Sequence, residues 1–298
     1  MIRLENTSGG DVAAAIAAER HRLGSPTTGM VLTLLIITDE ESQADATAAA
    51  VATARQHPMR IVTLIPRPDA RVTQLDAMIS VGGDDGPGEV AVLRLRGKLA
   101  EYANSVAVPL LLPDTPVVAC WPGAAPDNPS DSKIGRHAQR RITDAANVRE
   151  PLTALAIRKA GYVPGDTDLS WARLTQWRSV LAASFDGPSA PVHHVRVEGE
   201  SENPSVALLG AWLGQSFGCT VEIIWNDKLG VTSVQLDMDT APLTITRYDT
   251  KTVVVVRPGR ADAHLTLPRR SVSALLAEEL RRLDPDDMYG DVITNLQL

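Results

Sequence analysis

The feature that most constrains this fold is a pair of apolar runs separated by one helix-length segment. Residues 30–37 read MVLTLLII, a continuous run that is typical of a strand buried on both faces of a sheet. The next run covers residues 61–65, and the Ala-rich stretch between the two runs ends at Pro58, which disfavours helix at the preceding residue. Strand, helix and strand at this spacing predict a right-handed βαβ unit with parallel strands.

The rest of the first half contains shorter elements. Apolar stretches at 76–81 and 89–95, joined by a Gly- and Asp-rich segment at 82–88, predict a hairpin. The remaining expected segments are, in chain order, a helix at about 98–106, a strand at 116–121 and a segment at 137–144. We therefore predict an N-terminal α/β domain built on a mixed, partly parallel sheet with flanking helices.

The composition changes at the linker-like string GYVPG, residues 161–165, and we place a domain boundary there, giving domains of residues 1–165 and 166–298. The second domain opens with a helix capped by Thr167 or Asp168. Repeated short β-rich segments between 219 and 267 then predict an antiparallel meander. The other elements expected in this α+β domain are a strand at 192–197, helices at 205–217 and 271–283, and a short acidic tail.

Charge and cysteine content exclude several classes of protein. The chain has 29 Lys and Arg residues against 36 Asp and Glu, a formal net charge of −7. An acidic chain is poorly suited to neutralising phosphates, so neither nucleic acid nor an anionic membrane is an expected partner. Cys120 and Cys219 are too few for a disulfide framework, and the sequence begins without a secretory pattern. We therefore expect a cytoplasmic protein.

Two motifs associated with nucleotide binding and catalysis lack the neighbouring secondary structure that their function requires. The Gly-rich segment 82–88 precedes a strand, whereas a dinucleotide loop requires a helix after it. Residues 214–218 read GQSFG and match GxSxG, but they end an apolar helix, with Gly218 placed as its left-handed cap. We therefore expect a plain hairpin loop at the first motif and no nucleophile at Ser216.

Candidate metal ligands are few. His193 and His194 are neighbours on an expected strand, so they point to opposite faces and cannot bind one metal ion together. The aspartates at 284, 286 and 287 do not follow the EF-hand spacing, and we expect a solvated acidic turn there. The sequence therefore predicts no catalytic residue, no metal site and no cofactor.

A set of Trp, Arg and Asp residues remains, in places where core packing alone does not require them. Trp and Arg are enriched at the centres of protein interfaces, so the set is our candidate partner-binding site. A second interpretation stays open, in which the tryptophans belong to the core and the arginines form structural ion pairs. The candidates are Trp121, Arg140, Arg141, Asp144, Trp171, Arg173, Trp177 and Arg178.

Several strings that contain these residues resemble the OpcA family of glucose-6-phosphate dehydrogenase assembly proteins. In order between about residue 30 and residue 290 they are VLTLLIIT, HPMRIVTLIPR, PLLLPDTPVVACWPG, GRHAQRRITDA, GDTDLSWARLTQWRSVLA and LRRLDPDDMYG. The resemblance implies a non-enzymatic protein that assembles and activates glucose-6-phosphate dehydrogenase, the first enzyme of the oxidative pentose phosphate pathway. Some family members respond to thioredoxin through cysteines, but Cys120 and Cys219 both lie in apolar contexts where we expect burial.

A rival hypothesis assigns a ligand to the N-terminal domain. Parallel strands bind ligands at their carboxyl ends, and Arg140 and Arg141 could hold the phosphate of a sugar phosphate or nucleotide there. Stabilisation of the chain by such a ligand alone would favour this hypothesis, whereas stabilisation only by the dehydrogenase would favour an assembly factor.

Overall fold

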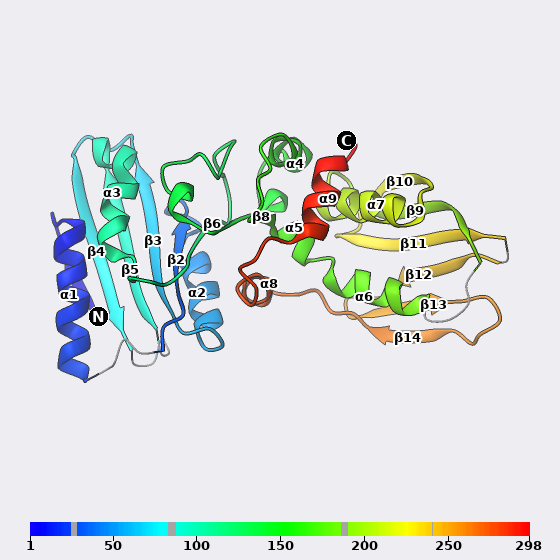
Figure 1. Cartoon of the computed structure of the whole chain (residues 1–298), viewed down its shortest axis with the longest axis horizontal. Coiled ribbons are helices and arrows are strands. Elements are labelled where there is room, and N and C mark those ends of the chain that lie inside the picture. The colour runs from blue at the N-terminus through cyan, green and yellow to red at the C-terminus, as the bar shows by residue number, and fades with distance from the viewer. Residues whose placement is uncertain (25–28, 83–87, 186–189, 240) are drawn as a thin grey trace. The chain divides into compact units, whose positions relative to one another are not determined.

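The computed structural model describes residues 1–24, 29–82, 88–185, 190–239 and 241–298 (Figure 1). The chain forms two compact units, and each unit is made of three separate stretches of the sequence. Unit 1 comprises Met1–Asp144, Gly165–Thr167 and Val272–Pro285, and unit 2 comprises Ala145–Pro164, Asp168–Ser271 and Asp286–Leu298. The boundary at 165/166 stays a prediction about independently folding domains, because compact units in a folded chain do not establish independent folding.

The elements of unit 1 are, with η marking 3₁₀ helices, β1 (Ile2–Leu4), α1 (Gly9–Leu23), β2 (Leu32–Ile37), α2 (Gln43–Ala54), β3 (Met59–Arg67), β4 (Gln74–Val81), β5 (Glu89–Arg96), η2 (Gly97–Tyr102), α3 (Ala103–Ala107), η3 (Val108–Leu110), β6 (Val117–Trp121), η4 (Gly135–His137), β7 (Arg140–Thr143), β8 (Asp166–Asp168) and α8 (Val272–Glu279). Their strands form one sheet, sheet A, in the order β1-β4-β5-β3-β2-β6-β7-β8. The predicted βαβ unit is confirmed, because β2 pairs with β3 in parallel and Leu34 lies opposite Ile61. The predicted hairpin is confirmed by the antiparallel pairing of β4 with β5.

Helices cover the two faces of sheet A unequally. Helices α1 and α3 lie on one face, where Val12 and Ile16 of α1 join the core, and α2 lies on the other (Figure 1). Side chains of β4 are alternately half-buried and buried, so Leu75 and Ile79 enter the core while Met78 lies on the opposite face. Strand β2 is buried on both faces, as its continuous apolar run predicts.

The elements of unit 2 are η5 (Ala145–Asn147), α4 (Pro151–Ala160), α5 (Leu169–Ala172), α6 (Thr175–Ser184), β9 (Val192–Glu200), α7 (Pro204–Phe217), β10 (Thr220–Asn226), β11 (Val231–Met238), β12 (Leu243–Arg247), β13 (Thr252–Val256), β14 (Ala263–Thr266) and α9 (Asp287–Asn295). Their sheet, sheet B, has the order β10-β9-β11-β12-β13-β14. The predicted meander is found in β11 to β14, which pair in antiparallel. Strand β10 differs, because α7 carries the chain across the sheet and β10 pairs with β9 in parallel.

Three segments differ from their expected form. The helix expected from Asp168 is divided into α5 and α6, and the helix expected at 98–106 is the 3₁₀ helix η2 followed by α3. The acidic tail contains helix α9, whose first turn is capped because the carboxylate of Asp286 accepts the Tyr289 N–H. Most of the glycine loop expected at 82–88 lies outside the described residues.

Candidate functional site

The candidate contact residues divide into a buried majority and a half-buried pair. The buried members, each at most 7% exposed, are Trp121, Arg140, Arg141, Asp144, Trp171 and Trp177. Arg173 and Arg178 on unit 2 are half-buried. The burial of the three tryptophans agrees with the core interpretation, whereas contact of any member with a partner stays a prediction.

Arg140 and Arg141 are held by carboxylates of unit 1. Arg140 pairs with Glu279 and donates a second hydrogen bond to the Asp284 carbonyl at 2.7 Å, and Arg141 pairs with Asp166. Both arginines begin β7, which runs parallel to β6, so they lie at the amino end of the strand. The rival hypothesis places them at the carboxyl ends as phosphate ligands, and this placement is wrong. Their charges are already compensated by the protein.

The strings GDTDLSW and LDPDDMYG meet in an aromatic cluster of unit 2. Trp171 donates its indole N–H to the Asp286 carboxylate at 2.9 Å, although the two residues are 115 positions apart. The Tyr289 ring lies 6.0 Å from the Trp171 ring, and the Arg178 guanidinium covers that ring at 3.8 Å. Asp286 therefore anchors a tryptophan and caps a helix, and the expectation of a merely solvated acidic turn is wrong at this residue.

Gly290 packs directly against the same cluster. A Cβ atom at this position would lie 2.4 Å from the Tyr162 hydroxyl, and the Tyr162 ring makes an edge contact with Tyr289 at 5.9 Å. A larger residue at this point of α9 would therefore require the Tyr162 ring to move out of its contact with Tyr289. Parts of these two strings thus contribute to the core of unit 2.

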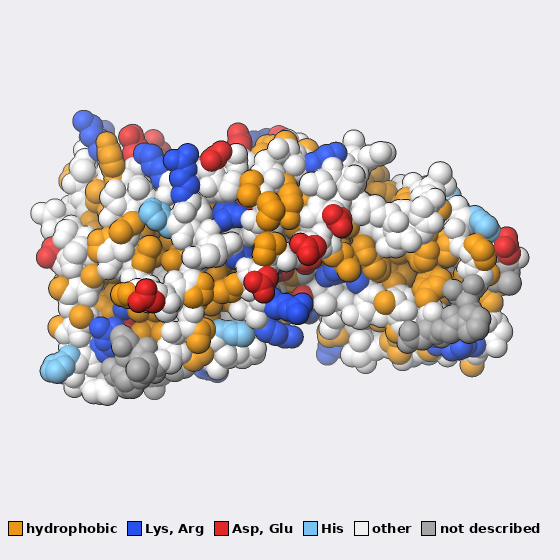
Figure 2. Space-filling model, in the orientation of Figure 1, with side chains coloured by type: hydrophobic (Ala, Val, Ile, Leu, Met, Phe, Trp, Pro, Cys, Tyr) orange, Lys and Arg blue, Asp and Glu red, His pale blue; other side chains and the backbone are white. Residues whose placement is uncertain are grey.

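Arginine side chains converge on a cavity in unit 2, which we call the arginine cavity. Its volume is about 300 Å³. Figure 2 shows acidic and basic side chains interspersed on one face of the chain, and four of the side chains that line the cavity are arginines. Its lining includes Arg173, Trp177, Arg247, Arg269 and Arg270. Sequence reasoning selected Arg173 and Trp177 from this set but missed the three later arginines.

Backbone carbonyl groups hold the later arginines in place. Arg247 donates to the Leu267 carbonyl at 2.9 Å, and Arg269 donates to the Leu229 carbonyl at 2.6 Å. Burial lowers the pKa of Arg247, and the positive charge of Arg269 lowers it further. Carbonyl acceptors orient a guanidinium without cancelling its charge.

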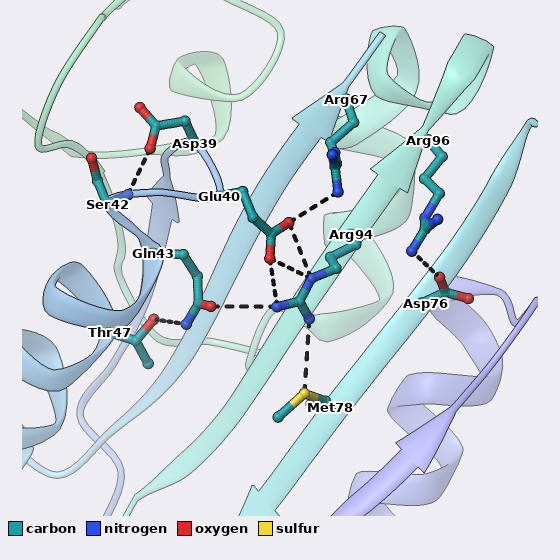
Figure 3. A network of polar contacts seen from close by, with 10 residues as sticks. All are labelled: Asp39, Glu40, Ser42, Gln43, Thr47, Arg67, Asp76, Met78, Arg94 and Arg96. Carbon is teal, nitrogen blue, oxygen red and sulfur yellow. Dashed lines mark hydrogen bonds and ion pairs between the residues drawn. The ribbon is translucent and has the colours of Figure 1, made fainter. Parts of the chain in front are cut away.

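A second polar cluster lies at the carboxyl end of strands β2 and β3 in unit 1 (Figure 3). Glu40, in the connection after β2, accepts a hydrogen bond from Arg94 of β5 at 2.8 Å and pairs with Arg67 at the end of β3 at 3.5 Å. The hydrogen bond from Arg94 is the main cause that lowers the pKa of Glu40. Beside them, Arg96 pairs with Asp76 at 3.0 Å. We call this set the carboxyl-edge cluster.

Sequence reasoning missed the carboxyl-edge cluster, although one signal was present. Asp39 and Glu40 follow the buried strand β2 after one residue, and Arg67 ends the next strand. Charged residues after parallel strands meet at one edge of the sheet, which is where such folds bind ligands. Each arginine here already has a carboxylate partner, so the cluster leaves little charge for an anionic ligand.

An apolar groove of about 440 Å³ borders this cluster. Small side chains of α2, including Ala44, Ala48 and Val51, form one wall, and Met78 and Val92 of sheet A form the floor. The groove therefore lies between α2 and the face of sheet A that α2 covers.

The remaining side chains that could act as nucleophiles or metal ligands have structural surroundings that the chain itself provides. Ser216 donates its hydroxyl to the Trp212 carbonyl at 2.7 Å inside α7, which Gly218 ends with φ +62° as predicted. Cys120 is buried, but Cys219 is half-buried, and the expectation of full burial is wrong there; partial burial raises the pKa of its thiol. His193 pairs with Asp239 at 2.7 Å near the surface.

Neither a metal-ligand cluster nor a membrane-spanning helix is found in the described ranges. No group of three or more His, Cys, Asp or Glu side chains there could hold a metal ion. No helix in the described part of the chain has both the length and the apolar character needed to cross a bilayer.

Comparison with known proteins gives matches along most of the chain. Residues 50–160 match the family "Glucose-6-phosphate dehydrogenase subunit N-terminal domain", and residues 164–293 match the corresponding C-terminal domain. A putative OxPP cycle protein OpcA of Synechococcus elongatus is 25% identical over 249 residues. That match covers 72% of this chain but 55% of the relative, so the chain spans about half the length of the curated relative it matches.

Two solved structures that match this chain are oxidoreductases. The 3-ketoreductase KijD10 of Actinomadura kijaniata matches with a TM-score of 0.48 and 12% identity, over 89% of this chain and 94% of that chain. An oxidoreductase of Sinorhizobium meliloti matches with a TM-score of 0.42 and 12% identity, over 89% of this chain and 86% of that chain. At these scores and identities the similarity indicates neither an activity nor a ligand.

Proposed function

This chain belongs to the OpcA family, and we propose that it is a non-enzymatic assembly factor and allosteric activator of glucose-6-phosphate dehydrogenase in the oxidative pentose phosphate pathway. The observation that carries the proposal is the match of both subunit domains, in chain order, to residues 50–160 and 164–293. The name of the cyanobacterial relative, an OxPP cycle protein, supports the same pathway.

The roles of the chemistry-bearing side chains support a binding function. Ser216 is part of a helix, Arg140 and Arg141 are compensated by carboxylates, and the carboxyl-edge cluster is paired within itself. A binding protein needs none of these groups for chemistry. We therefore propose that the chain works without a catalytic residue and without a cofactor of its own.

Activation requires that the chain bind one state of the enzyme better than another. A differential affinity of ~1–3 kcal/mol between an active assembly and its inactive alternatives changes their ratio by a factor of about 5–150. A small number of interface residues supply most of such a difference.

We propose the Trp and Arg set as the contact region, with its members in two roles. Arg173 and Arg178 are half-buried, so their outer surfaces can touch a partner directly. The buried members hold the region in shape, as Trp171 does by supporting the Arg178 guanidinium at 3.8 Å. This assignment separates residues that touch the partner from residues that affect binding only by keeping the contact region folded.

In the decisive experiment, the purified chain is added to the glucose-6-phosphate dehydrogenase of the same organism. The catalytic rate of the dehydrogenase and its sedimentation are then measured. We expect a higher rate and a shift in oligomeric state.

Variants of the chain separate direct contacts from structural residues. Arg178→Ala should weaken activation by ~1–2 kcal/mol and preserve folding, whereas the exposed control Arg260→Ala should change neither activation nor folding. Trp177→Ala should instead lower the melting temperature, because truncating a buried tryptophan costs ~3–5 kcal/mol. If the unmodified chain alters neither rate nor sedimentation, the proposal is wrong.

We also propose a cytoplasmic location. Cys120 and Cys219 are both free thiols, which fits a reducing compartment. Detection of a tagged chain in fractions of the cell tests the location. Recovery of the chain in the secreted fraction would contradict the proposal.

A further inference from the structure

Basic side chains outnumber acidic ones in the lining of the arginine cavity of unit 2. Four guanidinium groups line it, and Glu200 is the one carboxylate among the lining side chains that the structure describes. Oxygen Oε2 of Glu200 accepts hydrogen bonds from the Gly230 N–H at 2.9 Å and from the Asn203 amide at 2.8 Å. That carboxylate is therefore occupied in holding the loop before β11 and the start of α7.

Two of the arginines are held by carbonyl oxygens, and the carboxylate of Asp249 offsets less of the charge effect on Arg247 than burial and Arg269 impose. Within the described part of the chain, the hydrogen bonds of Arg247 and Arg269 go to carbonyl oxygens. The lowered pKa of Arg247 agrees with this, since burial and the nearby Arg269 both disfavour its charged form and outweigh the nearby Asp249, which favours it. Two guanidinium groups kept close together against mutual repulsion are stabilised when an anion lies between or beside them.

The start of α7 adds a second source of positive potential. Asn203 and Ser205, at the amino end of this 14-residue helix, both line the cavity. A helix dipole places partial positive charge at its amino end and favours a nearby anion.

The size and walls of the cavity restrict the anion. About 300 Å³ is at the lower end of small-molecule sites, which is too small for a dinucleotide. Trp177, Leu229 and Leu267 supply apolar wall, so part of the ligand must be uncharged carbon. Arginine forks bind phosphate oxygens through paired hydrogen bonds.

We propose that the arginine cavity binds a small organic phosphate, a phosphate monoester on a short carbon chain or ring. Arg247 and Arg269 hold the phosphate, the amino end of α7 adds to its stabilisation, and the apolar wall receives the carbon part. Arg173 and Trp177 of the lining also belong to the proposed contact region, but the binding of a phosphate does not require the proposed action on the dehydrogenase.

Isothermal titration calorimetry of the purified full chain tests the proposal. The probes are inorganic phosphate and glucose 6-phosphate, and glucose is the uncharged control. We expect both phosphates to bind, glucose 6-phosphate more tightly, and glucose not to bind. Arg269→Gln should weaken binding of both phosphates by about tenfold, because one charge-assisted hydrogen bond is lost. Arg269 is exposed, so the variant should keep its fold, which its melting temperature checks.

The matched control is Arg260→Gln, an exposed arginine of the same unit outside the cavity lining. It should leave both affinities unchanged, and Arg247→Gln should repeat the loss seen with Arg269→Gln. No binding of either phosphate, or binding that Arg269→Gln leaves unchanged, overturns the proposal. Binding of an acidic peptide but of neither phosphate also overturns it and assigns the cavity to a protein partner. Because no dehydrogenase is present, failure here leaves the proposed activation untouched.

Discussion

Unit 1 and unit 2 each gather arginines, but they compensate the charge differently. In the carboxyl-edge cluster of unit 1, Arg94 and Arg67 share the carboxylate of Glu40 (Figure 3). In the arginine cavity of unit 2, Arg247 and Arg269 face carbonyl oxygens instead. A carboxylate partner cancels the charge of a guanidinium, whereas a carbonyl only fixes its direction. The acceptor, more than the number of arginines, therefore sets how much positive charge a cluster leaves for an anion.

The largest expected effect tests compensation in the interior of unit 1. Glu89 is buried and accepts hydrogen bonds from Arg60 at 2.6 Å and from Arg20 at 3.0 Å. Glu89→Gln should lower the free energy of unfolding by ~3–5 kcal/mol, because two arginines lose their counter-charge in a low-dielectric site. Urea denaturation measures it. Glu5→Gln, in an exposed pair with Arg3, is the control and should cost less than about 1 kcal/mol.

A smaller effect is expected when an uncompensated arginine is removed from unit 2. Arg247→Met keeps most of the apolar stem and relieves the repulsion with Arg269, which offsets the loss of the hydrogen bond to Leu267. The free energy of unfolding should therefore change by less than about 1.5 kcal/mol, measured as for Glu89→Gln. A cost as large as that of Glu89→Gln would show that Arg247 is compensated after all, and would remove the contrast between the units.

The smallest effect is a pH dependence at the carboxyl-edge cluster. The pKa of Glu40 is lowered in the folded chain, so its pairing stabilises the fold above the ordinary glutamate pKa and is lost as pH falls through the lowered value. Glu40→Gln should therefore cost less than about 1 kcal/mol near neutral pH, because the pair is partly exposed. The difference between wild type and variant should shrink toward zero in acid. A difference that stays constant with pH would assign the effect to packing.

Local sequence patterns predicted individual elements well. The apolar run at 30–37 predicted a strand buried on both faces, and β2 is such a strand. Helix α7 begins after Asn203 and ends at a left-handed Gly218, close to the ends that its sequence predicts. These outcomes depend on backbone geometry and on burial over a few residues, which a short stretch of sequence already contains.

Partners distant in the chain could not be read from the sequence. No local signal joins Trp171 to Asp286, and nothing in the string at 220–225 indicates that β10 pairs in parallel with β9 rather than continuing the meander. Such pairings depend on which apolar faces are buried together, and many alternative partners have similar local preferences.

The sequence by itself determined the positions of most strands and helices, the motifs of the OpcA family and the absence of a helix after the Gly-rich segment 82–88. Only the tertiary structure decided which arginines meet a carboxylate and which meet a carbonyl. The reason is physical: the charge of an arginine is fixed by its chemistry, but its compensation depends on the acceptors that folding brings within a few ångströms. In this chain that difference separates the paired arginines at the edge of sheet A from the arginine cavity of unit 2.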